Sequence, residues 1–273
     1  MMLLALAGLP GPDGVAGFAR RASMGAKDAT SEVTARTGAR FATTHWSVVF
    51  AAGHGGSAQA SEALAELCRT YWYPLYAYSR RTGCSPEDAQ DLTQGFFEHL
   101  LENRLLASAD AAKGRFRSFL LQCLRNFMAT EHAHATRQKR GGGQWVLSLD
   151  AAGAEARFGR EMADPRTPEL LYERNWALEV LDEAMLQVER DFAKSGRERT
   201  FQILRPRLQG EQNGFSHAAL ARELSTSEGT VRVMVHRLRR RYREVLNGVV
   251  LRTVSSPAEV EDELRHLLQV VQG

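Results

Sequence analysis

The sequence is poor in the features that mark several large classes of protein. It has three cysteines in 273 residues, and none forms a C-x-x-C pair, so no disulfide framework is expected. No apolar run approaches the ~20 residues that a membrane-spanning helix needs. The apolar start, residues 1–9, lacks a basic segment and is broken at Pro10, so it does not have the pattern of a signal peptide. These absences favour a cytoplasmic protein with no membrane partner.

Signatures of catalysis are also missing. The sequence contains no phosphate-binding Walker loop, no nucleophile elbow and no dinucleotide fingerprint. His132 and His134 are two residues apart, and on a helix their rings would point about 200° apart, which does not suit a shared metal ion. No convincing alternating strand pattern occurs either. We therefore expect an all-α chain with no catalytic activity, no cofactor and no metal site.

Helical periodicity runs through nearly all of the chain after residue 43. The pattern predicts helices at 59–82, from Ser85-Pro86 to about 102, and at 113–137, with a kink or restart at Pro74. A glycine run then interrupts the pattern. We expect two helical domains joined by a flexible linker. The expected parts are a disordered extension (1–43), a first domain (44–140), a linker (141–166), a second domain (167–250) and a C-terminal amphipathic helix (251–273).

The segment 215–246 has the pattern of a short helix, a tight turn and a long helix. Ser227 suits the N-cap of the long helix, and Glu228 suits its positive end. Between 228 and 246 there are six arginines and two glutamates, so the net charge is +4. Apolar residues recur every three or four positions on one side, and the other side carries Arg232, His236, Arg239, Arg240 and Arg243. This predicts a helix-turn-helix that enters the DNA major groove, the alternative being a solvated charged face.

Charge also separates between two neighbouring helices of the first domain. Residues 85–102 hold five acidic side chains and no Lys or Arg, so their net charge is −5. Residues 111–143 hold seven basic side chains and one acidic one, so theirs is +6. Opposite charge on adjacent helices suggests two different partners. Pairing of these charges within the domain is the alternative.

Two blocks in a fixed order resemble a bacterial RNA polymerase sigma factor of the extracytoplasmic-function type. The first block is YWYPLYAYSRRTGCSPEDAQDLTQGFFEHLL at 71–101, followed by GRFRSFLLQCLRNFMA at 114–129. The second is the helix-turn-helix at 215–246. The resemblance covers roughly 44–140 and 167–247. It implies an all-α fold and a function in promoter recognition, with core RNA polymerase and promoter DNA as partners.

The resemblance also implies roles for individual residues. The D-L-x-Q pattern would bind polymerase through Asp91, Leu92 and Gln94, although Gly95 stands where the family usually has an acid. The basic helix would open and read the minus-ten element, and the helix-turn-helix would read the minus-thirty-five element. The implied minus-ten residues are Arg115, Arg117, Arg125, Asn126, Arg137, Lys139 and Arg140. The implied minus-thirty-five residues are Ser227, Glu228, Thr230, Arg232, His236, Arg239 and Arg240.

A dimeric helix-turn-helix repressor or activator is the alternative function. It would bind a palindromic site, whereas a sigma factor is expected to be a monomer when free. An anti-sigma protein is a further partner that the resemblance leaves open. The acidic and leucine-rich tail, residues 257–271, is expected either to pack on one of the domains and modulate access to DNA or polymerase, or to complete the core of the second domain.

Overall fold

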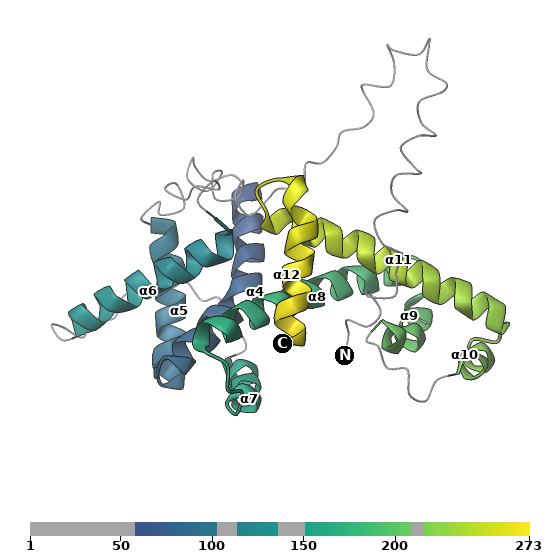
Figure 1. Cartoon of the computed structure of the whole chain (residues 1–273), viewed down its shortest axis with the longest axis horizontal. Helices are drawn as coiled ribbons and strands as arrows, with labels where there is room; N and C mark the ends of the chain where they lie inside the picture. The colour runs from purple at the N-terminus through teal and green to yellow at the C-terminus, as the bar shows by residue number, and fades with distance from the viewer. Residues whose placement is uncertain (1–57, 103–113, 136–150, 209–215) are drawn as a thin grey trace, which may run out of the picture. The chain divides into compact units, whose positions relative to one another are not determined.

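The computed structural model describes residues 58–102, 114–135, 151–208 and 216–273 (Figure 1). Every element in these ranges is a helix, and no strand occurs in them, which confirms the predicted all-α class. The expected N-terminal extension, residues 1–43, lies outside the described ranges. No helix within them is long and apolar enough to cross a membrane.

The described helices divide into two compact units. The larger unit takes the helices up to Gln187 and again from Glu244 to the C-terminus, and the smaller unit takes Val188–Arg243. The division therefore falls inside two long helices, α8 (Pro168–Lys194) and α11 (Glu228–Thr253). The sequence pattern placed the domain boundary near residue 167. The difference arises because apolar side chains of α8 complete the core of the preceding helices.

Three helices begin the larger unit: α4 (Ala58–Arg81), α5 (Pro86–Glu102) and α6 (Phe116–Ala135). The helix α4 continues through Pro74 rather than restarting there. Ser85 caps α5, since its Oγ accepts a hydrogen bond from the Asp88 backbone N at 3.1 Å. The helices bury one aromatic and aliphatic core, whose members include Tyr71, Leu75, Phe96, Leu100, Phe116, Leu120 and Leu124.

Part of the expected linker is a helix. Residues 151–161 form α7 (Ala151–Glu161), while residues 141–150 lie outside the described ranges. The Glu155 carboxylate accepts hydrogen bonds from Tyr76 Oη at 2.5 Å and from Arg80 Nη2 at 2.7 Å, both on α4. Arg157 lies over the Tyr73 ring, 3.7 Å from its centroid. These contacts fasten α7 to α4, a long-range pairing that the local glycine-rich composition does not reveal.

The first part of α8 and the C-terminal helix complete the larger unit. Trp176 and Tyr172 of α8 are fully buried, and Tyr172 Oη donates to the Arg117 carbonyl oxygen at 2.9 Å. After α11 come a short 3-10 turn, η5 (Pro257–Glu259), and α12 (Val260–Gln272). The amphipathic segment predicted at 257–271 is thus helical over nearly all of its length.

The smaller unit is built from the end of α8, α9 (Glu198–Leu204), η4 (Arg205–Arg207), α10 (His217–Glu223) and the first part of α11. The Phe192 and Phe201 rings lie 5.6 Å apart between α8 and α9. Further buried side chains of the core include Leu204, Leu208, Leu220, Val231, Val235 and Leu238. This core holds α10 and the start of α11 in a fixed relation.

Candidate nucleic-acid interface

Hydrogen bonds fix the start of α10 and close the turn between α10 and α11. Ser216 caps α10 through its Oγ, which accepts from the Ala219 backbone N at 3.1 Å. Beyond α10, the Thr226 backbone N donates to the Ala221 carbonyl oxygen at 2.9 Å. Ser225 has a φ of +50°, a left-handed conformation that costs a non-glycine residue about 1 kcal/mol. The short helix α10 is therefore followed by a tight turn and then by the long helix α11.

The predicted cap at Ser227 is present at the start of α11. Its Oγ accepts a hydrogen bond from the Thr230 backbone N at 3.1 Å and lies 2.9 Å from Thr230 Oγ1. Ser227, Glu228 and Thr230 are all exposed. The first turn of α11 is thus ordered by its own side chains and leaves its polar groups accessible.

One stripe of α11 points directly away from the core of the smaller unit. Successive residues on a helix turn by about 100°, so Val233 lies about 160° from both Val231 and Val235, which are buried. The side chain of Val233 is 48% exposed. Arg237 and Arg240 follow it on nearly the same line, and both are exposed. An apolar side chain followed by arginines therefore forms an exposed line of the helix.

Other residues predicted to contact DNA lie on either side of this stripe, and their side chains differ in how far they are buried. Arg232 and His236 are exposed beside it. Arg239 is half-buried, and its Nη2 donates to the Arg207 carbonyl oxygen at 3.4 Å, so it packs against η4. Sequence reasoning missed Val233 and Arg237. A full helical wheel would have placed both residues outward, since each lies on the side of α11 opposite Val231 and Val235.

The polymerase-binding residues implied by the resemblance lie on α5. Asp91 is exposed, and Leu92 and Gln94 are half-buried. Gln94 Nε2 donates to Glu98 Oε1 at 3.2 Å. Because Glu87, Asp91, Gln94 and Glu98 recur every three or four residues, they share one face of the helix. This acidic face belongs to the larger unit.

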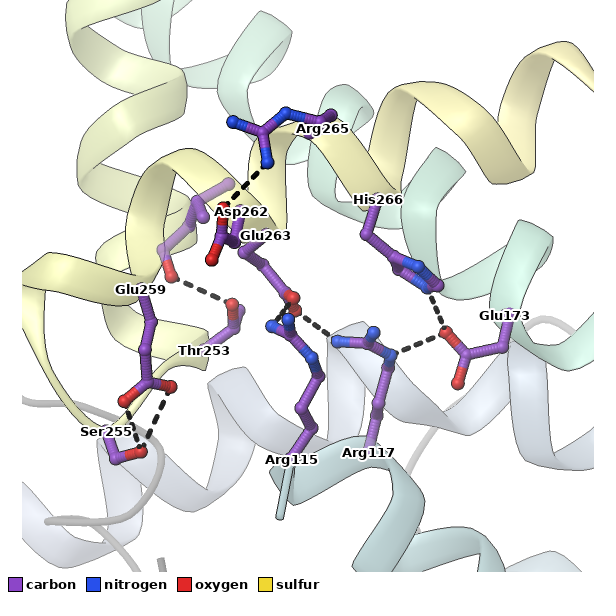
Figure 2. Close-up of polar contacts among 11 residues, drawn as sticks. Arg115, Arg117, Glu173, Thr253, Ser255, Glu259, Asp262, Glu263, Arg265 and His266 are labelled. Atoms are coloured by element: carbon purple, nitrogen blue, oxygen red, sulfur yellow. Dashed lines mark hydrogen bonds and ion pairs between the residues drawn. The ribbon is translucent and has the colours of Figure 1, made fainter.

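The arginines expected to line the minus-ten path are engaged by carboxylates within the larger unit. Arg117 is 3% exposed and forms an ion pair with Glu173 at 2.6 Å. Its guanidinium also lies 4.1 Å from the centroid of the Trp176 ring. Arg115 and Arg117 both form ion pairs with Glu263 of α12 (Figure 2). Burial, and then the charge of Arg117, lowers the pKa of Arg115.

The other basic-helix residues vary in accessibility. Arg125 donates to Tyr78 Oη at 2.8 Å and pairs with Glu169. The hydrogen bond to Tyr78 is the main cause of the raised pKa of Arg125. Asn126 is exposed, and its Oδ1 accepts from Gln122 Nε2 at 3.0 Å. Three further predicted residues lie outside the described ranges: Arg137, Lys139 and Arg140. Arg115, Arg117 and Arg125 thus pair within the larger unit, but their partners are Glu263, Glu173 and Glu169 and not the acidic residues of 85–102.

Comparison with protein-family models, with curated proteins and with solved structures gives no match. The geometry of the two units is therefore the basis for assigning a function.

Proposed function

We propose that this chain is a bacterial RNA polymerase sigma factor. In this proposal the smaller unit reads duplex promoter DNA with α11, and the larger unit binds core polymerase with α5. The observation that carries the proposal is the outward stripe of α11, where Val233, Arg237 and Arg240 follow a capped turn and point away from the core.

The stripe has the chemistry needed to read a base sequence. An α-helix fits the major groove of B-DNA, where each base pair presents its own pattern of donors, acceptors and methyl groups. Arginine can bond guanine through two hydrogen bonds, and an apolar side chain can contact the thymine methyl. We assign base contacts to Arg232, Val233 and Arg237. We assign phosphate contacts, which position the protein without reading sequence, to Arg240 and Arg243.

The acidic face of α5 supports the second half of the proposal. Asp91 is exposed there, and the D-L-x-Q resemblance implies that such a face docks on polymerase. Gly95 leaves the position after Gln94 without a charge. Glu98, one turn beyond, keeps a carboxylate on the same face. A protein that only repressed or activated transcription as a dimer would have no need of this surface.

Run-off transcription with purified core polymerase tests the proposal. The full chain should be required for transcription from its promoter, and D91N should weaken polymerase binding roughly tenfold, corresponding to one charged hydrogen bond of about 1.5 kcal/mol. E261Q removes an exposed carboxylate, 82% accessible, from α12 and serves as the charge-matched control. Duplex binding should be unchanged in both.

The DNA-reading half has its own variants. R237A should weaken binding to the selected promoter more than binding to random duplex, while R160A, an exposed arginine of α7, should change neither. Failure of the purified chain to bind core polymerase would contradict the proposal. A stable dimer that bound only palindromic duplexes would favour the repressor or activator instead.

A further inference from the structure

The ion-pair cluster on α12 has the form of an occupied anion site. The guanidinium groups of Arg115 and Arg117 converge on one carboxylate, that of Glu263, as Figure 2 shows. The side chain of Glu263 is fully buried. Two arginines closing on one anion is also the arrangement by which proteins hold a phosphate group.

The arginine on the inner side of the cluster is held in place independently of Glu263. Arg117 Nε bonds Glu173 at 2.6 Å, and its guanidinium lies over Trp176. His266 Nε2 lies 2.9 Å from the same Glu173 carboxylate. If the Glu263 side chain were displaced, Arg117 would still be paired with Glu173 through its Nε. Arg117 Nη1 and the Arg115 guanidinium would then be available to bind another anion.

The helix that carries Glu263 is held by a small part of its surface. Only Glu263 and Leu267, one turn apart, are buried on α12. Glu261, Asp262 and Arg265 are exposed, and their ion pairs stay within the helix. Terminal elements with few buried contacts open locally at a lower free-energy cost than the whole fold. A short isolated helix is marginal in water, so α12 would lose its order once released.

We propose that the Arg115–Arg117 pair is a phosphate-binding site for a single nucleic-acid strand, and that Glu263 fills it in the free chain. A backbone phosphate and the Glu263 carboxylate compete for the same two guanidinium groups. The exchange keeps the arginines paired, since a charge left buried without a partner is strongly unfavourable. The inference rests on the proposed function, because the strand would be the opened minus-ten region, and α12 would restrain its binding until a promoter is engaged.

Binding of a fluorescent single-stranded oligonucleotide tests the exchange. E263Q keeps the shape of the side chain and removes its charge, a chain ending at Ser256 removes α12, and E261Q is the charge-matched control on the same helix. The first two should bind the strand more tightly than the unmodified chain, by a factor on the order of 5 to 150, and E261Q should not. The one phosphate that the pair neutralises should contribute about 0.7 to the slope of log K against log salt.

Hydrogen exchange on the unmodified chain gives a readout that needs no variant. Because the strand and α12 compete, saturating oligonucleotide should speed exchange of the backbone amides between 260 and 272. Amides of α9 (Glu198–Leu204), to which no nucleic-acid contact is assigned, serve as the internal reference.

Two outcomes separate this inference from the proposed function. Equal or weaker strand binding by E263Q and the shortened chain, with unchanged exchange in α12, would overturn the exchange and make α12 a structural helix only. Promoter duplex binding that still depended on Arg237 would leave the proposed function standing in that case. Absence of any nucleic-acid binding by every form would overturn both.

Discussion

Val233 and Arg237 lie one helical turn apart on the line of α11 that points away from the core. Val233 is 48% exposed, and no packing within its unit explains an apolar side chain there. If it contacts a thymine methyl, V233A should abolish the difference in affinity between a promoter duplex and the same duplex with uracil at that thymine. The unmodified chain should show a difference of about 1 kcal/mol, the low end for one altered base pair.

The measurement is a competition binding assay with the two duplexes. The exposed position predicts that V233A folds with unchanged stability, within about 0.5 kcal/mol. If V233A still bound the thymine duplex more tightly than the uracil duplex at every thymine of the site, the contact between Val233 and a thymine methyl would be contradicted.

Arg117 should be among the most sensitive positions for stability. R117A would leave the buried Glu263 carboxylate with one partner fewer. It would also remove the ion pair between Arg117 and Glu173 and the contact with Trp176. Breaking a buried ion pair from one side costs about 3–5 kcal/mol. Urea unfolding measures the effect. R265A, whose pairs with Glu261 and Asp262 are exposed, should cost no more than about 1 kcal/mol. Equal losses in the two variants would contradict the burial of Arg117.

The contact of α7 with α4 should weaken in acid. Hydrogen bonding from Arg80 holds the pKa of Glu155 below its ordinary 4.5. A carboxyl with a lowered pKa in the folded state adds stability that is present above 4.5 and is lost as pH falls through the folded value. E155Q should therefore be less stable than the unmodified chain near pH 6, by at most about 1 kcal/mol because the side chain is partly exposed.

Below pH 4.5 the difference should shrink as Glu155 takes up a proton. Thermal unfolding of both forms at several pH values between 3 and 6 measures this, with E261Q as the charge-matched control. A gap between E155Q and the unmodified chain that stayed constant with pH would contradict the role of the ionised carboxylate.

Gly95 offers a test on the acidic face of α5. Glycine inside a helix is less stable than alanine by about 1 kcal/mol. A Cβ at Gly95 would lie 3.6 Å from Phe127 Cζ, an ordinary van der Waals contact. G95A should raise the melting temperature by roughly 2–4 °C. Gly83 has a φ of +105°, so G83A adds the same methyl group and should lower it. A lower melting temperature for G95A would show that the position is more crowded than the Phe127 contact indicates.

Local signals in the sequence determined the helices of this protein. Ser85, Ser227 and the start of α8 at Pro168 could be predicted because caps and first-turn residues act on neighbours three residues away. The buried side of α11 could also be predicted, because its apolar residues recur every three or four positions. Of the kink or restart predicted at Pro74, the restart does not occur, because α4 is one helix from Ala58 to Arg81.

The tertiary structure alone decided which charges meet. Arg117 pairs with Glu263, 146 residues along the chain, and Arg80 meets Glu155, 75 residues along. No local spacing encodes such pairs, so the sequence could indicate a basic segment but not whether its arginines face solvent or carboxylates. The same holds for α7, whose helix is fastened by contacts with α4. Periodicity and capping are properties of neighbouring residues, whereas ion pairing and burial depend on which helices the folded core brings together.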